Sequence, residues 1–148
     1  MKPLKENKKA HLDYEVLDQY DAGLVLTGAE VKSAKLGQVD MEGSYISLKP
    51  DGAWIRGLKI SCYQKSNLAA KDYNPERQRK LLLTKKELLE IGQKSTTQGL
   101  TIIPLLLYTT PSLVKLRLAI VRGRKKFDKR EVIKKREFAR RLNTRVRH

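Results

Sequence analysis

Hydrophobic and polar residues alternate along much of the chain, and this pattern predicts a body built mainly from strands. Apolar side chains recur at every second position in residues 12–16 and again in residues 114–120, as in strands with one buried face. Residues 100–108 are apolar on both faces, which is typical of a buried strand. Pro104 lies inside this run and indicates a bulge or a sheet edge, because proline cannot donate a backbone hydrogen bond.

Turn-forming residues separate the remaining strand-like runs. The segment Pro50-Asp51-Gly52 lies between residues 44–49 and 53–60, and therefore predicts a hairpin. A short apolar run at residues 24–26 is bounded by glycines near both of its ends. Together these runs predict about six strands.

Two short helices interrupt the strands. Residues 29–36 form the first, with Gly37 as the residue that closes its C-terminal end. The second runs from Thr84 to about Lys94 and opens with a capping box, Thr84 with Glu87. Because strands and helices do not alternate in a βαβ rhythm, we expect a mainly β fold. The predicted architecture is a small closed antiparallel OB-type barrel of about six strands, with two or three short helices.

The chain carries a large excess of positive charge. Its 32 Lys and Arg residues against 16 Asp and Glu residues give a net charge of +16. Residues 122–148 contribute +10 of this charge, so we divide the chain into a body, residues 1–121, and a basic C-terminal tail, residues 122–148. Self-repulsion of this size favours a polyanionic partner. Nucleic acid is favoured over a membrane because no amphipathic anchor is visible.

The tail contains the start signal of a helix. Asp128 and Glu131 form a capping-box pattern. Phe138, Leu142 and Val146 then recur every four residues, a stripe too narrow to hold an isolated helix. We expect the tail to be disordered when free and helical when phosphates neutralise it. A solvated tail without a binding role is the alternative.

Simple features of the sequence disfavour several function classes. The longest apolar run has nine residues and the first residues lack an apolar signal segment, so we expect a soluble, cytoplasmic protein. The single cysteine, Cys62, excludes an internal disulfide and is interpreted as an inert thiol. His11 and His148 lie at opposite ends of the chain, and no hydrolase or phosphate-loop signature is present. We therefore expect no catalysis, cofactor or metal, and a nuclease is disfavoured.

Two polar clusters are candidates for binding. Glu30, Lys32 and Ser33 share one short predicted helix. The carboxylate of Glu30 either stabilises the helix start or accepts hydrogen bonds from bases and 2′-hydroxyls. The second cluster is the basic segment 77–80, which precedes the three leucines of residues 81–83. It is either a binding rim beside an apolar anchor or a solvated turn.

Trp54 and Tyr45 lie on facing strands of the predicted hairpin. Aromatic residues at such positions belong to the core more often than they serve as platforms for base stacking. We therefore place both side chains in the core.

Five motifs occur in the order and spacing of a known family. They are Asn7-Lys8-Lys9-Ala10 followed by Tyr14, Gly28-Ala29-Glu30-Val31-Lys32-Ser33, residues 75–83, residues 99–108 with Pro104, and residues 123–130. In these motifs the chain resembles the SsrA-binding protein family, small protein B, of bacterial trans-translation. The resemblance covers nearly the whole chain.

This resemblance implies an OB-type barrel that binds the tRNA-like domain of transfer-messenger RNA and delivers it to stalled 70S ribosomes. The tail would then occupy the decoding centre and the empty messenger channel. The elongation factor that carries aminoacyl-tRNA would be a further partner. A ribosomal or rRNA-chaperone protein that acts without transfer-messenger RNA is the alternative.

The resemblance also implies which residues bind. Those expected to bind RNA are Asn7, Glu30, Lys32, Ser33, Arg79, Lys80, Leu83, Lys125, Lys126, Asp128, Lys129 and Arg130. Those expected to bind the ribosome lie in the tail and are Lys134, Lys135, Arg136, Arg140 and Arg141.

Overall fold

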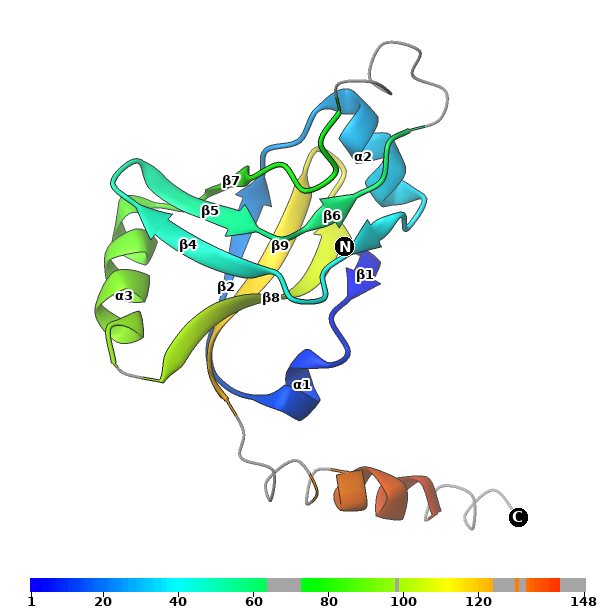
Figure 1. Ribbon diagram of the computed structural model, residues 1–148, viewed down its shortest axis with the longest axis vertical. Coiled ribbons are helices and arrows are strands. Elements are labelled where there is room, and N and C mark those ends of the chain that lie inside the picture. Colours follow the sequence, from blue (N-terminus) through cyan, green and yellow to red (C-terminus); the bar gives the residue numbers. More distant parts are fainter. Residues whose placement is uncertain (64–72, 98, 124–129, 131–132, 142–148) are drawn as a thin grey trace.

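The structure is a computed structural model that describes residues 1–63, 73–97, 99–123, 130 and 133–141 (Figure 1). Most of its strands are β1 (Lys2–Glu6), β2 (Tyr14–Leu24), β4 (Tyr45–Lys49), β5 (Gly52–Arg56), β7 (Arg79–Leu82), β8 (Leu100–Thr109) and β9 (Val114–Gly123). Within the described residues, these seven form one antiparallel sheet with the hydrogen-bonded order β1-β8-β9-β2-β7-β5-β4. Two short strands, β3 (Val39–Asp40) and β6 (Lys59–Ile60), pair separately.

Three helices accompany the sheet in the described part of the body. α1 (Ala10–Asp13) connects β1 to β2, α2 (Gly28–Lys35) follows β2, and α3 (Lys85–Ser95) follows β7. Figure 1 shows α2 and α3 on opposite sides of the curved sheet. Two of these helices, α2 and α3, confirm the predicted ones within one residue at each end.

The ends of α2 and α3 follow the predicted signals. Thr84 and Glu87 form the expected capping box of α3. Gly37 closes α2 with a φ of 76°, and its N–H donates to the carbonyl of Ala34 (2.9 Å). The N–H of Gln38 donates to the carbonyl of Ser33 (3.1 Å), which completes a Schellman motif.

The core lies on the inner face of the curved sheet. β9 contributes Leu116, Leu118 and Ile120, each at most 1% exposed, as its alternating pattern predicts. Ile55 of β5 and Ile91 of α3 are completely buried in the same cluster. Burying each such side chain stabilises the fold by about 1.5–3 kcal/mol.

The sheet curls back on itself without closing by hydrogen bonds. The edge strand β4 lies against β8, but no ladder joins these two strands among the described residues. The prediction of a mainly β, antiparallel fold with short helices is therefore confirmed. The closed barrel is not found in the hydrogen-bonding pattern.

Pro104 produces the predicted bulge in β8. The register between β8 and β9 shifts between Pro104 and Leu106. The bulge is held from the other side, because the backbone N–H of Asn7 donates to the carbonyl of Leu105 (2.8 Å). The side-chain amide of Asn7 donates to the carbonyl of Pro104 (2.8 Å).

Several predicted strand boundaries were wrong. The alternation at residues 12–16 is not one strand, because Leu12 lies in α1 and the strand begins only at Tyr14. This strand, β2, continues to Leu24, so the predicted run 24–26 supplies only its last residue, and Val25 and Leu26 lie outside any strand. The run 53–60 is divided between β5 and β6.

Two strands of the sheet, β1 and β7, have no counterpart in the prediction. β1 holds one aliphatic side chain, and β7 is a basic pair followed by leucines, so neither shows a period of two. Both are fixed by backbone pairing to neighbouring strands, β1 to β8 and β7 to β2 and β5. Such pairing leaves little signal in the order of side chains.

Gly57 divides β5 from β6. Its φ is 79°, and a Cβ at this position would lie 3.3 Å from the Cα of Ser44. Both the left-handed backbone and the close approach of another backbone segment therefore require glycine.

We expect Gly57→Ala to lower the free energy of unfolding by about 2 kcal/mol, because alanine is strained at positive φ. Gly28→Ala is the matched control, since a Cβ there meets nothing within 4 Å. It should change the stability by less than about 0.5 kcal/mol. Urea denaturation measures both variants, and equal effects would contradict this role of Gly57.

Candidate RNA-binding site

Glu30 is positioned by the start of α2. Its backbone N–H donates to the hydroxyl of Thr27 (3.2 Å), and its carboxylate accepts from the backbone N–H of Thr27 (3.0 Å). This reciprocal capping box satisfies two N–H groups at the helix start. It also turns the side chain of Glu30 inward, where none of it is exposed.

Arg79, the first residue of β7, lies against the Glu30 carboxylate and is also completely buried. Its Nε donates to Glu30 Oε2 at 2.7 Å. The other four N–H groups donate to the carbonyls of Leu58 (2.8 Å), Arg77 (2.9 Å) and Pro75 (3.1 Å) and to the hydroxyl of Tyr73 (3.1 Å). All five donors of this buried cation are thus satisfied, which is the condition for burying it.

Arg77 is the outer member of the group. Its Nη2 forms an ion pair with Glu30 Oε1, while 40% of its side chain is exposed. Tyr73 donates its hydroxyl proton to the carbonyl of Ile60 (2.7 Å) and lies 3.2 Å from Glu30 Oε2. Burial and the charge of Glu30 raise the pKa of Tyr73, so its hydroxyl stays neutral. We call Glu30, Tyr73, Arg77 and Arg79 the Glu30 cluster.

The Glu30 cluster keeps its carboxylate ionised despite burial. Burial by itself would raise the pKa of Glu30. The hydrogen bond from the Thr27 N–H and those from Arg77 and Arg79 outweigh burial and lower the pKa from 4.5 to about 2. The cluster therefore holds two guanidinium groups and one carboxylate, a net charge of +1, at any pH near neutrality.

The other predicted residues near the cluster differ in exposure. Lys32 is exposed, with its ammonium 5.4 Å from the centre of the Tyr63 ring. Ser33 is buried, and its hydroxyl has no hydrogen-bond partner among the described residues. Lys80 is half-buried on the opposite face of β7 from Arg79, and Leu83 packs against the core.

The structure therefore distinguishes surface residues from buried ones in the predicted set. Lys32 and Lys80 are accessible to a ligand, whereas the side chains of Glu30, Ser33 and Arg79 lie beneath the surface. In this conformation the buried three are placed to support the surface, and direct contact between them and RNA stays a prediction.

Arg77 was missing from the predicted binding residues, although it lies in the basic segment 77–80. The signal that could have found it is the spacing of Arg77 and Arg79 two residues apart. In an extended segment such residues point to the same side, so one carboxylate can bind both. The structure shows that Arg79 is enclosed and Arg77 faces outward.

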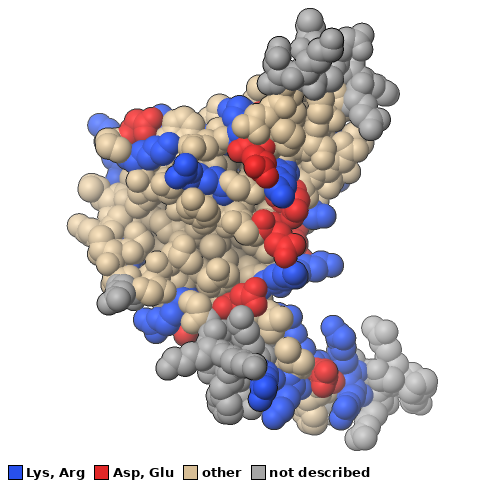
Figure 2. Space-filling model, viewed as in Figure 1, with Lys and Arg blue, Asp and Glu red and all other residues tan. Residues whose placement is uncertain are grey.

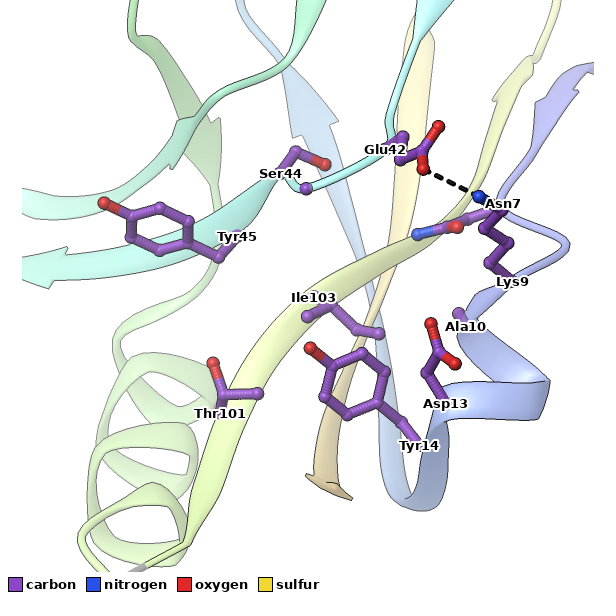
Figure 3. A pocket seen from close by; sticks show the side chains of 11 residues that line it. Asn7, Lys9, Ala10, Asp13, Tyr14, Glu42, Ser44, Tyr45, Thr101 and Ile103 are labelled. Atoms are coloured by element: carbon purple, nitrogen blue, oxygen red, sulfur yellow. Dashed lines mark hydrogen bonds and ion pairs between the residues drawn. The ribbon is translucent and has the colours of Figure 1, made fainter. Parts of the chain in front are cut away.

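Asn7 lies in another part of the body, at the junction of β1 and α1. It borders a hollow of about 460 Å³ between α1, the start of β4 and β8 (Figure 3). An ion pair between Lys9 and Glu42 (2.8 Å) crosses the rim, and Tyr14 and Tyr45 border the opening. The amide of Asn7 is used within the body to hold the β8 bulge, so contact with RNA by Asn7 stays a prediction.

The whole chain can be compared with known proteins. The model of the family described as SmpB protein matches residues 4–148. An SsrA-binding protein from Carboxydothermus hydrogenoformans is 38% identical over 146 residues, covering 99% of this chain and 97% of the relative. An SsrA-binding protein from Anaplasma marginale (strain Florida) is 43% identical over 141 residues, covering 95% and 93%. The chain belongs to the SmpB family.

A solved structure agrees with this assignment. It is described as "tmRNA-SmpB: a journey to the center of the bacterial ribosome" and matches with a TM-score of 0.70 and 37% sequence identity. The match covers 88% of this chain and 94% of the solved one. The body of this SmpB-family chain therefore has the family fold.

The tail of this SmpB-family chain is described in part. Residues 130 and 133–141 are helical and exposed, and they include the predicted Arg130, Lys134, Lys135, Arg136, Arg140 and Arg141. The predicted Lys125, Lys126, Asp128 and Lys129 lie outside the described residues, as does the Asp128–Glu131 capping box. Whether the tail is disordered when free stays a prediction.

Two further findings concern the described residues only. None of their helices is long and apolar enough to cross a membrane. No group of three His, Cys, Asp or Glu side chains among them could hold a metal ion.

Replacing Glu30 by Gln should destabilise the protein in a pH-dependent way. The folded pKa of about 2 lies below the ordinary 4.5, so the stabilisation is complete above pH 4.5 and is lost as the pH falls towards 2. At pH 7 it amounts to about 3 kcal/mol. Between pH 7 and pH 3, the gap in unfolding free energy between wild type and Glu30→Gln should narrow by about 2 kcal/mol.

Urea denaturation at the two pH values measures this gap. Glu87→Gln is the matched control, because Glu87 forms the same capping box at α3 in an exposed position without arginines. A gap that is constant with pH would show that Glu30 acts only as a helix cap.

Proposed function

We propose that this chain is a non-enzymatic RNA-binding protein that binds the tRNA-like domain of transfer-messenger RNA. In this proposal it delivers that RNA to stalled 70S ribosomes for trans-translation in the bacterial cytoplasm. The match to the SmpB family, the relatives named SsrA-binding protein and the structural neighbour described as tmRNA-SmpB support this function.

The observation that carries the proposal is the exposed guanidinium of Arg77. Its Nη2 is held by Glu30, which fixes the side chain, while 40% of the side chain remains exposed. A guanidinium held in this way can bind a phosphate through its remaining N–H groups with little further loss of rotamer freedom. Buried Arg79 fixes Glu30 in turn, so the rigid part of the site lies below the surface.

We further propose that the two parts of the chain act separately. The body, residues 1–121, would bind the tRNA-like domain, and the tail, residues 122–148, would bind the decoding centre and the messenger channel. The predicted binding residues are assigned accordingly, with Glu30, Ser33 and Arg79 supporting the surface rather than forming it. The elongation factor that carries aminoacyl-tRNA is the expected additional partner of the complex.

The proposal includes the shape of the body. We propose that the sheet acts as an OB-type barrel whose gap lies between β4 and β8. The support for this is that β4, at the end of the hydrogen-bonded order, lies against β8. Side chains at the hollow near Tyr45 and Ile103 border the same gap (Figure 3).

The function is tested by binding of the full chain to a transcript of the tRNA-like domain, with elongator tRNA as competitor, over a series of salt concentrations. We expect the preference for the tRNA-like domain to persist as salt rises, because shape and base contacts do not weaken with counterion release. If both RNAs dissociate along one steep salt dependence, the ribosomal or rRNA-chaperone alternative is favoured instead.

Arg77→Gln should weaken binding of the tRNA-like domain about tenfold, as expected for the loss of a charge-assisted phosphate contact. Arg117→Gln is the matched control. Arg117 is also partly exposed and forms an ion pair, with Asp21 at 3.2 Å, on the outer side of β9. Filter binding measures the affinity of both variants for the tRNA-like domain. Equal losses of affinity would show that Arg77 contributes only through the net charge of the protein.

Cutting the chain after Phe127 should separate the two activities. Affinity for the tRNA-like domain should stay within a few-fold of the full chain, since the body keeps the Glu30 cluster. Tagging of stalled nascent chains in a reconstituted translation system should be lost. Equal loss of binding and tagging would contradict the division into body and tail.

A further inference from the structure

The strands β4, β5 and β7 place basic and aromatic side chains on their outer face, and none of their own residues is acidic. The sequences of these strands, YISLK, GAWIR and RKLL, contain no Asp or Glu. Ser47, Trp54 and Lys80 lie opposite one another across the three strands and so share this outer face. In Figure 2, basic side chains lie among uncharged ones over the region where Figure 1 places β5 and β7.

Trp54 is at the centre of this face, and its position corrects the sequence interpretation. The side chain is half-buried and lies outside the buried core, whereas Ala53 and Ile55 on either side of it are completely buried. Tyr45, which was also placed in the core, is 44% exposed. Strand alternation explains both, because the inward positions of β4 and β5 are taken by aliphatic residues.

Two lysines lie on the Trp54 ring. The ammonium of Lys49 is 5.1 Å and that of Lys80 is 6.0 Å from the ring centre. The indole Nε1 donates to the carboxylate of Asp51 (3.1 Å), which fixes the edge of the ring. Gly52 has a φ of 132°, which favours glycine, and a Cβ there would be in ordinary van der Waals contact with the Cε of Lys80 (3.5 Å).

The charges of both lysines are not neutralised by an ion pair among the described residues. Lys49 donates instead to the neutral amide oxygen of Gln78 (2.7 Å). Lys59, by contrast, is paired with Glu76. Two cations held beside one aromatic ring, with no carboxylate bound to them, form a site suited to an anion that carries a flat ring of its own.

This face is continuous with the Glu30 cluster. In the segment that enters β7, Arg77 and Arg79 bind Glu30, Gln78 binds Lys49, and Lys80 lies on the Trp54 ring. A nucleic acid strand bound at Arg77 can therefore continue onto the outer face by crossing this one segment.

We infer that Trp54, Lys49 and Lys80 form a site for single-stranded RNA, in which the ring stacks on an unpaired base and the two ammonium groups bind the flanking phosphates. The inference rests on the proposed RNA-binding function and adds a second contact to it. An unpaired base is required because the bases of a duplex are already stacked on one another.

Trp54 is the only tryptophan of the chain, so its fluorescence reports on this site alone. The full chain is titrated with a single-stranded RNA of eight nucleotides and, separately, with a blunt RNA duplex. We expect saturable quenching by the single strand, because a stacked base quenches indole emission, and little quenching by the duplex. Unchanged emission while the single strand binds, or equal quenching by the duplex, would overturn the assignment.

Two double variants, each of which removes two positive charges, test the role of the lysines. Lys49→Gln with Lys80→Gln should weaken binding of the single strand about tenfold and reduce its salt slope by about 1.4. Lys2→Gln with Lys5→Gln is the control, since both are exposed on β1, at the other end of the sheet order. A loss in the control as large as in the test variant would overturn the inference.

The variants Trp54→Phe and Trp54→Ala distinguish a loss of base stacking from a loss of protein stability. Fluorescence anisotropy of a labelled single strand should show binding within about threefold for Phe, which still stacks, and about tenfold weaker for Ala. Urea denaturation of both variants compares their stabilities, and equal RNA affinities for Phe and Ala would contradict stacking.

Binding of the tRNA-like domain by the same proteins distinguishes the two proposals. If the wild type prefers this domain but the single strand does not quench Trp54, the second site is wrong and the proposed function stands. If the single strand quenches Trp54 but no preference for the domain is found, the proposed function is wrong and the site is a general one for single strands.

Discussion

The buried ion pair between Glu30 and Arg79 is the constraint on which the rest of the site depends. A buried arginine is tolerated only when its charge and all its donors are matched. Here the matching groups come from α2 and from the segments before β6 and β7. Removing Glu30 would leave the charge of Arg79 in the interior without a carboxylate. The position of Arg77 at the surface is therefore set from below, by residues that no ligand has to touch.

The sequence predicted the features with local causes. The capping box of α3, the glycine at the end of α2, the hairpin at residues 50–52 and the bulge at Pro104 each follow from a few neighbouring residues. It did not predict the features that depend on residues far away in the chain. β1 is a strand because β8 pairs with it, and Leu12 is helical although its neighbours alternate. Whether the sheet closes into a barrel likewise depends on the curvature of all its strands, so no short segment of the sequence indicates it.

The same distinction applies to the binding residues. The motifs identified Glu30 and Arg79 as candidates, but a motif does not indicate whether a side chain is exposed or buried. Only the structure shows that these two are enclosed, and that Arg77 and Trp54, which the sequence left out or assigned to the core, are accessible. Polar residues that cluster in sequence are thus a guide to the location of a site rather than to its contact surface.

Hydrogen bonds connect the two ends of the stretch between Ile60 and Tyr73. The Ile60 N–H donates to the carbonyl of Pro75 (3.0 Å), its carbonyl accepts from Tyr73, and Arg79 binds both Pro75 and Tyr73. The cost of closing a loop rises only slowly with its length once its ends are held. A change in the length of this stretch would therefore cost little free energy, provided that the contacts of Ile60, Tyr73 and Pro75 at its two ends are kept. The ends of the stretch, and not its length, are what the charge of Arg79 requires.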